Sequence, residues 1–248
     1  MSVAASAALS AYLSALAKAD YRSAYGALQS QGQRYYRNEP NFESGFRVEH
    51  FALERYRIIT SRASAGGIVF VVRETIAFYN DALNRMVHAR VNVPYAVVNQ
   101  FGSPRIKDPG HPWKALRVNL STEKDGVRAT VRKLLFYPQY LAITLTFVNE
   151  RSGFMTALPY NKSILTDQAG AIYRSLVIKD WGVTDRAFFL GVHLAGNAEM
   201  TGTMRFAIPP NADPQTLTFE LAPIVRDAGD TAPFALDFQP IDTTISPS

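Results

Sequence analysis

Histidine is the side chain best suited to proton transfer near neutral pH, and the chain has four, at His50, His88, His111 and His193. No two of them have the H-x-x-x-H spacing of a helical zinc site, so the sequence predicts no metal site. His50 stands four residues before Glu54. On a helix this spacing would form either an acid–base pair in a pocket or an ordinary hydrogen bond on the helix surface.

His88 lies in a stretch of alternating residues, on the polar side between Met86 and Arg90. If that face lined a cavity, the imidazole could act as a base. His50 and His88 are therefore the two candidate bases of an enzyme hypothesis. Neither belongs to a recognisable catalytic constellation, so no catalytic residue is assigned.

Aromatic side chains are frequent in the first fifty residues: Tyr12, Tyr21, Tyr25, Tyr35, Tyr36, Phe42 and Phe46. Such rings either pack helices onto a sheet or line an amphipathic pocket for an apolar or sugar-like ligand, with Arg34 or Arg37 at the rim. On the second interpretation, the candidate ligand-binding residues are Tyr36, Arg37, His50 and His88.

Asp167, followed by Gly170 and Tyr173, could contribute to a calcium site. Calcium takes about six to eight oxygen ligands, and one acidic residue in this stretch is too few. An Asx-type turn that closes a hairpin is the favoured interpretation. The chain also has no G-x-S-x-G sequence, P-loop or dinucleotide motif, so no cofactor is expected.

The composition describes a chain that can bury a core: 248 residues, 47% hydrophobic and 19% charged. With no cysteine, disulfides, thiolate zinc sites and iron–sulfur clusters are excluded. No apolar run approaches the roughly 20 residues that cross a bilayer. We expect membrane attachment only through a segment outside this chain.

The net charge of +5 is unevenly distributed. Residues 1–114 carry 14 basic and 8 acidic residues, whereas residues 115–248 carry 12 and 13. A basic region can bind nucleic acid, an anionic membrane or an acidic ligand. The arginines are scattered singly, without an RNP or zinc-finger motif, so we expect a solvated basic surface and no nucleic-acid partner.

The first part of the chain changes from helical to strand periodicity. Residues 4–19 show an amphipathic helical stripe, Asp20 is placed as the N-cap of a short helix over 21–28, and Gly32 is expected to end it. After a tyrosine-rich connector at 33–40, a third helix is predicted over 41–53. Strands are predicted over 56–64, 68–79, 85–99 and 100–106.

The strongest break in the chain is Asp-Pro-Gly-His-Pro at residues 108–112, and the domain boundary is placed just after it, at 114. From residue 116 onward no helix is predicted. Short alternating strands predict an antiparallel β-sandwich, with the segments 116–122, 127–137, 141–149, 163–166, 200–208, 216–222 and 234–238.

Residues 4–107 resemble the nuclear-transport-factor-2-like, or cystatin-like, α+β cone. The segment AYLSALAKADYRSAYGALQS (residues 11–30) carries the resemblance, and the long strands at 68–79 and 85–99 fit the curved sheet of that superfamily. The resemblance implies three helices packed on a sheet with a pocket at the wide end. Members include polyketide cyclases, ketosteroid isomerases and non-catalytic binding domains.

Residues 116–241 resemble bacterial immunoglobulin-like domains of unknown function from envelope proteins and lipoproteins. The segments that carry this resemblance are LAITLTFVNERSG (141–153), ILTDQAGAIYRSL (164–176) and AGNAEMTGTMRFAIPP (195–210). Such domains are mostly non-catalytic, and the resemblance implies an extracytoplasmic setting.

The expected fold class is therefore an α+β cone, with helices packed on a curved antiparallel sheet (1–114), followed by an all-β immunoglobulin-like sandwich (115–248). The expected function is a non-enzymatic binding or assembly module of the bacterial cell envelope, whose partner is a protein or a small apolar or sugar-like ligand. The alternative is a cyclase- or isomerase-like enzyme that uses His50 or His88 as its base. Nucleic-acid binding through the basic first part is a third class. Oligomeric state is left open.

Overall fold

The computed structural model describes residues 3–64, 66–107, 111–176, 188, 191–209, 212–226 and 232–244. Two compact units divide the chain at Met1–Lys114 and Ala115–Ser248. The division falls at the predicted boundary, although residues 108–110 of the predicted break lie outside the described residues. The domain types assigned to the two units stay predictions.

The helices of the first unit are short and lie before residue 49. They are α1 (Val3–Ala17), α2 (Tyr21–Ala27), α3 (Ser30–Tyr36) and α4 (Glu39–Val48). The predicted cap is confirmed, because the Asp20 carboxylate accepts a hydrogen bond from the Ser23 amide at the start of α2. Asn38 caps α4 in the same way through the amide of Asn41.

Two helix predictions are wrong. The helix predicted over 21–28 ends at Ala27, before Gly32, and Gly32 lies inside a separate helix, α3, which extends into the predicted connector at 33–40. The helix predicted over 41–53 ends at Val48, since His50 has a positive φ of 47° and Ala52 already belongs to a strand.

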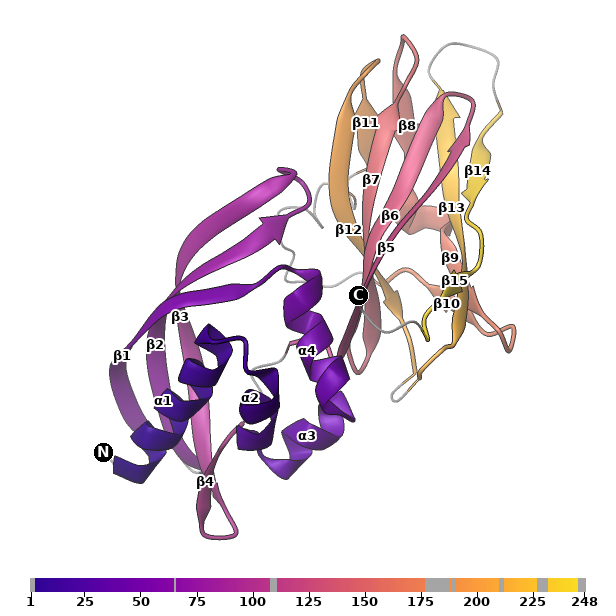
Figure 1. The fold of residues 1–248 in the computed structure, drawn as a ribbon. Coiled ribbons are helices and arrows are strands. Elements are labelled where there is room, and N and C mark those ends of the chain that lie inside the picture. The colour runs from indigo at the N-terminus through magenta and orange to yellow at the C-terminus, as the bar shows by residue number, and fades with distance from the viewer. Residues whose placement is uncertain are drawn as a thin grey trace. The chain divides into compact units, whose positions relative to one another are not determined.

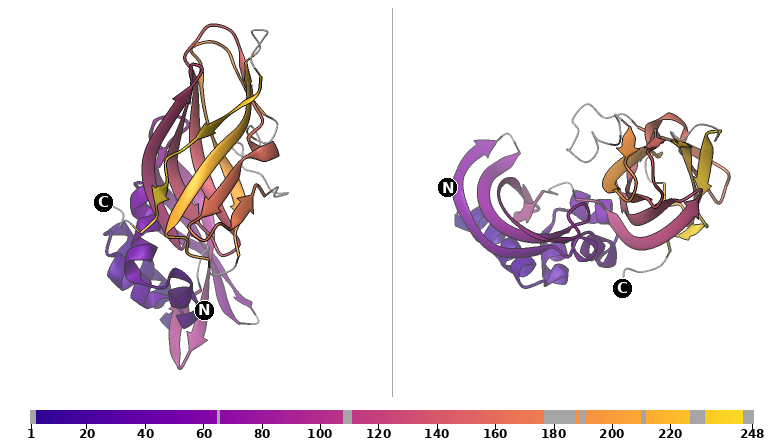
Figure 2. Two further views of the ribbon diagram at one scale, coloured as in Figure 1. Left: turned by 90° about the vertical axis from the view of Figure 1, so that its right-hand side faces the viewer. Right: turned by 90° about the horizontal axis from the view of Figure 1, so that it is seen from above.

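The sheet of the first unit is antiparallel, with the order β1-β2-β3-β4 (Figure 1). Its strands are β1 (Ala52–Ser64), β2 (Gly67–Asn80), β3 (Arg85–Gln100) and β4 (Ser103–Ile106). The long strands β1 to β3 are visibly curved in Figure 2. On β2 and β3 the period of two places Phe70, Val72 and Tyr95 on one buried face.

Helix α1 contributes its buried stripe to the core of this unit. Leu9, Tyr12, Leu13 and Leu16 are buried, and the Tyr12 ring meets the Tyr95 ring of β3 edge-on at 6.0 Å between centroids. The Tyr56 hydroxyl of β1 donates to the Ser10 carbonyl of α1. These contacts hold α1 against β1 and β3 and position the side chains of Tyr12, Tyr56 and Tyr95.

The second unit consists of two antiparallel sheets. The first has the order β12-β7-β6-β5, and the second has the order β10-β9-β13-β8-β11 with β14 and β15 also paired to β13. The strands are β5 (Lys114–Lys124), β6 (Val127–Phe136), β7 (Tyr140–Asn149), β8 (Met155–Ala157), β9 (Ile164–Asp167), β10 (Ile172–Arg174), β11 (Val192–Leu194), β12 (Glu199–Ala207), β13 (Thr216–Arg226), β14 (Phe234–Asp237) and β15 (Ile241–Asp242).

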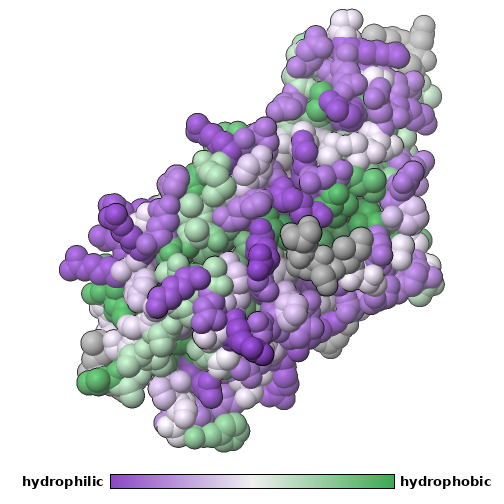
Figure 3. Space-filling view, in the orientation of Figure 1, coloured by the Kyte–Doolittle hydropathy of each residue, from purple (hydrophilic) through white to green (hydrophobic). Residues whose placement is uncertain are grey.

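Apolar side chains from both sheets form the core of the second unit. Phe206 of β12 and Phe219 of β13 come from different sheets, and their rings meet edge-on at 5.8 Å. A four-residue helix, α5 (Pro159–Lys162), interrupts the strands. In Figure 3, hydrophilic side chains cover much of the visible face and hydrophobic ones form smaller areas between them, as expected when apolar groups are buried.

The expected fold class, an α+β cone followed by an immunoglobulin-like sandwich, is wrong. Strands make up more than half of the described residues and form three antiparallel sheets, whereas the helices are few and short. The four helices of the first unit are short and end at Val48, so they contribute little of the regular structure. Beyond that residue, the period of two dominates and gives a mostly antiparallel β chain.

A buried guanidinium connects several loops of the second unit. Arg226, which is 8% exposed at the end of β13, donates to the carbonyls of Asp125 and Ser152 and to Oδ1 of Asn149. The Asn149 amide in turn donates to the carbonyls of Gly153 and Leu194. Neutral oxygens thus satisfy this charge, which would otherwise be costly to bury.

We expect Arg226→Leu to destabilise the second unit by about 3 kcal/mol, because it leaves buried carbonyls and the Asn149 amide without their donor. Urea unfolding monitored by circular dichroism measures this change. Arg174→Leu, at an exposed position of β10, is the matched control and should cost less than about 0.5 kcal/mol. Equal effects of the two substitutions would contradict a stabilising role for Arg226.

Candidate functional site

The first unit contains a largely apolar pocket of about 140 Å³. Helices and the loops beside them contribute Leu16, Phe46, Phe51 and His111, and the sheet contributes Leu53, Glu74, Ile76, Val91, Val93 and Tyr95. Most of these side chains are aliphatic or aromatic. A concave apolar site with few polar groups is the usual form of a small-molecule pocket.

Glu74 is the acidic group of this pocket. Phe70, Val72 and Glu74 follow one another at intervals of two along β2, so the carboxyl side chain shares the buried face of the sheet. Only 3% of the residue is exposed. Across the sheet, Glu74 pairs in register with Tyr56 of β1 and Val91 of β3.

The two carboxyl oxygens of Glu74 differ in their surroundings. The Tyr95 hydroxyl forms a side-chain hydrogen bond with the carboxyl group, yet Oε1 is buried and has no hydrogen-bond partner among the described residues. A buried acceptor or donor without a partner costs about 1–3 kcal/mol. Such a group needs an explanation, and a ligand that completes its hydrogen bonds is one.

Burial also changes the acidity of the site. It raises the pKa of Glu74 above its ordinary value, against the smaller opposing effect of the Tyr95 hydrogen bond. The pKa of Tyr95 is raised as well, first by burial and then by its tyrosine and carboxyl neighbours. Burial therefore makes both groups harder to ionise than they are in water.

Tyr36 and Arg37 lie outside this pocket. Tyr36 is fully buried at the end of α3, where its ring contacts Tyr35 and Phe42 edge-on. Arg37 has a positive φ of 67° and places its guanidinium 4.0 Å from the centre of the Trp113 ring. Tyr36 thus packs a core, and Arg37 stacks on a tryptophan.

The two candidate bases do not line the pocket either. His50 follows the end of α4, so the predicted helical pair with Glu54 does not form, and its ring lies 5.9 Å from that of Tyr79. Glu54 instead contacts His88, with 3.0 Å between Oε1 and Nδ1 and both side chains accessible to solvent. None of the four candidate ligand-binding residues, Tyr36, Arg37, His50 and His88, lines this pocket.

The Asx-type turn predicted at Asp167 is confirmed. Oδ1 accepts from the amides of Ala169 and Ala171 at 2.9 Å each, and Oδ2 accepts from the Tyr173 hydroxyl at 2.6 Å. These hydrogen bonds lower the pKa of Asp167, and burial together with the same carboxylate raises the pKa of Tyr173 to about 12. The Asp167 carboxylate therefore stabilises the turn between β9 and β10.

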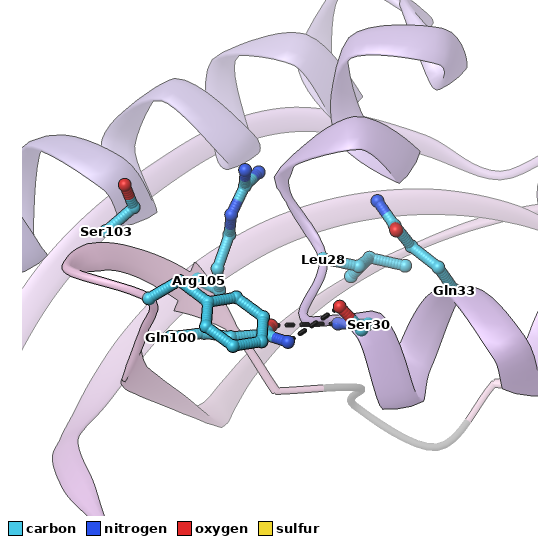
Figure 4. Close-up of a pocket in the computed structure, with 7 residues that line it drawn as sticks. Leu28, Ser30, Gln33, Gln100, Ser103 and Arg105 are labelled. Carbon is cyan, nitrogen blue, oxygen red and sulfur yellow. Dashed lines mark hydrogen bonds between the residues drawn. The ribbon is translucent and has the colours of Figure 1, made fainter.

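A second hollow of about 140 Å³ lies at the β3–β4 hairpin (Figure 4). Gln100 accepts from the Ser30 amide at 2.9 Å and donates to the Ser30 hydroxyl at 2.6 Å, while Arg105 donates to the Gly26 carbonyl. The neighbouring Phe101 is 96% exposed at the hairpin tip. Because these polar groups bond to the protein itself, this hollow is the weaker candidate.

Arginines that are scattered in the sequence gather on the outer face of the first sheet. Arg55 and Arg90 both pair with Thr75, and Arg57 pairs directly with Arg73. All four arginines are exposed. These four guanidinium groups make the outer face of the first sheet positively charged. Like charges placed opposite each other destabilise a sheet slightly.

The described residues offer neither a metal centre nor a membrane-spanning helix. No group of three or more histidine, aspartate or glutamate residues in that part of the chain could hold a metal ion. Among the helices described, none is long and apolar enough to cross a membrane.

Comparisons with known proteins add little. No family model matches the sequence. No curated protein matches it either. One similar solved structure is that of a functionally unknown protein from Listeria monocytogenes EGD-e, with 6% identity and a TM-score of 0.27 over 79% of this chain and 91% of that chain. A likeness this weak carries no argument, so the two family resemblances stay predictions.

Glu74, Tyr95 and His111 were not predicted from the sequence as residues of one pocket. The sequence does contain a signal for Glu74, because this residue interrupts the apolar residues on the buried face of a strongly predicted strand. A charged residue at a core position of an alternating strand is unusual and marks a candidate site. Tyr95 and His111 join Glu74 only through strand pairing and a loop.

The raised pKa of Glu74 predicts how stability depends on pH. The folded state holds this proton more tightly than the unfolded state, so wild-type stability falls as pH rises from the ordinary glutamate pKa through the folded one. Glu74→Gln cannot ionise, and its stability relative to wild type should therefore increase between pH 4 and pH 7. Thermal unfolding at both pH values measures the change.

Glu54→Gln is the control for this experiment, because Glu54 is an accessible carboxylate on the same sheet. We expect no comparable gain from pH 4 to pH 7 for this variant. If Glu74→Gln and Glu54→Gln respond alike, the Glu74 carboxyl ionises as easily as a surface group, and the prediction of a raised pKa is wrong.

Proposed function

We propose that the first unit binds a small, mostly apolar molecule in the pocket lined by Glu74. The observation that carries the proposal is that Glu74, a buried residue whose Oε1 has no partner in the described part of the chain, lines a pocket of mostly apolar side chains. A carboxyl placed among aliphatic side chains weakens a core. A ligand that hydrogen-bonds to it would offset this cost.

The size of the pocket limits the ligand. Its volume of about 140 Å³ is close to the roughly 150 Å³ of an apolar protein cavity that holds benzene. A single six-membered ring is therefore the expected scale. Ile76, Val91 and Val93 are only half-buried there, which leaves apolar surface for a ligand to cover.

This proposal keeps the expectation of a binding module and changes its site. Tyr36, Arg37, His50 and His88 are no longer the proposed contacts. The enzyme alternative had His50 or His88 as its base, and neither lines this pocket. An extracytoplasmic setting and a protein partner stay predictions from the resemblance.

Filling the pocket should abolish binding. In Val93→Phe the larger side chain projects from the sheet into the pocket, so we expect benzene to bind at least tenfold more weakly than to wild type, measured by NMR titration. Overpacking costs about 1–3 kcal/mol, which thermal unfolding would detect.

Val71→Phe is the matched control, since Val71 lies on the other face of the same sheet and is paired with Pro94. Benzene binding to this variant should equal that of wild type. Two results would refute the proposed function: no saturable binding to wild type of either benzene or phenol, whose hydroxyl group can hydrogen-bond to the carboxyl group, or equal loss in both variants.

A further inference from the structure

We propose that the outer face of the first sheet binds the phosphate backbone of a nucleic-acid duplex. The surface consists of Arg55, Arg57, Arg73 and Arg90, and we call it the arginine face. The inference is independent of the proposed function, because the pocket lies on the opposite face of the same sheet.

Strand alternation directs Arg73 away from the core. It stands between Val72 and Glu74 on β2, and both of these residues are buried. Helix α1 covers that buried face, where Tyr12 contacts Tyr95. Because side-chain direction reverses at each residue of a strand, Arg73 lies on the other face, where it is exposed to solvent.

Strand register brings the other three arginines beside Arg73. Arg57 of β1 stands directly opposite Arg73, and Arg55 and Arg90 stand on either side of Thr75. With about 4.8 Å between strands and about 7 Å between alternate residues, the four backbone positions occupy roughly 10 Å by 7 Å. The expectation of no nucleic-acid partner rested on arginines that are isolated in the sequence, and strand pairing makes these four neighbours.

Acidic groups neutralise little of this charge. Strands β1, β2 and β3 together contain six arginines, no lysine and two glutamates. Glu74 belongs to the buried face, and Glu54 contacts His88 at 3.0 Å. No residue of the arginine face forms an ion pair with another described residue. Like charges placed opposite each other disfavour the sheet, and a bound polyanion would offset that repulsion.

The side chains of this face favour a duplex over other polyanions. Guanidinium groups match phosphate oxygens in a two-pronged geometry, and a basic patch on one face is typical of nucleic-acid binding. Thr75 and Asn92 lie among the arginines, so this part of the face has neither an aromatic ring to stack on unpaired bases nor a large apolar side chain to enter a lipid layer. Phosphate contacts carry no sequence information, so we expect binding to be independent of sequence.

The test measures binding of the intact chain to a fluorescently labelled DNA duplex of about 20 base pairs by fluorescence anisotropy at several salt concentrations. If each of the four arginines neutralises one phosphate, the logarithm of the affinity should fall with the logarithm of the salt concentration at a slope of about −3.6. Binding should therefore weaken about 100-fold between about 50 and 200 mM salt.

Two double variants separate the arginine face from net charge. Arg57→Gln with Arg73→Gln should reduce the slope to about −1.8, so that the same change of salt weakens binding only about tenfold. Removing two like charges from opposite positions should not lower thermal stability, which shows that the loss is not unfolding. Arg22→Gln with Arg34→Gln removes the same charge from exposed positions on α2 and α3 and should leave the slope unchanged.

Each remaining outcome overturns the inference. No duplex binding at about 50 mM salt would do so. Equal changes of slope in the two double variants would also do so, because net charge alone would then explain binding. Tighter binding to a single strand with the same number of phosphates, or binding to phosphatidylserine vesicles and not to the duplex, assigns the face to another partner. The benzene titration does not involve this face, so the proposed function is tested separately.

Discussion

The carboxyl group of Glu74 is placed on the buried face of β2, where its neighbours along the strand are Phe70 and Val72. Burial removes the water that would stabilise a carboxylate, and the hydrogen bond from Tyr95 compensates only in part. Oε1 remains without a partner among the described residues. The burial of this carboxyl group with incomplete hydrogen bonds determines the polarity of the pocket and the raised pKa of Glu74, and it is the basis of the binding proposal.

Arg226 in the second unit shows how this protein buries a charge that serves stability. Its guanidinium donates to one oxygen beside the β5–β6 turn, that of Asp125, and to two oxygens at and just after the end of β7, those of Asn149 and Ser152, and the amide of Asn149 extends the network. Each of these hydrogen bonds ties one part of the unit to another. Glu74 is similarly buried, but one of its two carboxyl oxygens has no hydrogen-bond partner among the described residues, and the residue lines the apolar pocket. The contrast between a satisfied and an unsatisfied buried group is what points to a ligand at Glu74.

Local patterns predicted much of the secondary structure and little of the site. The alternation in residues 68–79 and 85–99 predicts β2 and β3 closely, because side-chain direction reverses at each residue of a strand. The pair of His50 and Glu54 fails because the backbone leaves the helix at Val48, a local change that spacing cannot show. Arg57 and Arg73 are far apart in sequence and opposite each other in the sheet. Only strand register, which depends on the whole fold, brings such residues together.

The pocket is therefore a place where the fold buries a carboxyl group whose hydrogen bonds are incomplete among the described residues. The central claim is that burial among apolar side chains raises the pKa of Glu74 above its ordinary value. Carbon-13 NMR of the Glu74 carboxyl carbon measures its titration directly, with Glu74→Gln to assign the signal. We expect a pKa above the ordinary glutamate value of about 4.3. A pKa at or below that value would contradict the claim.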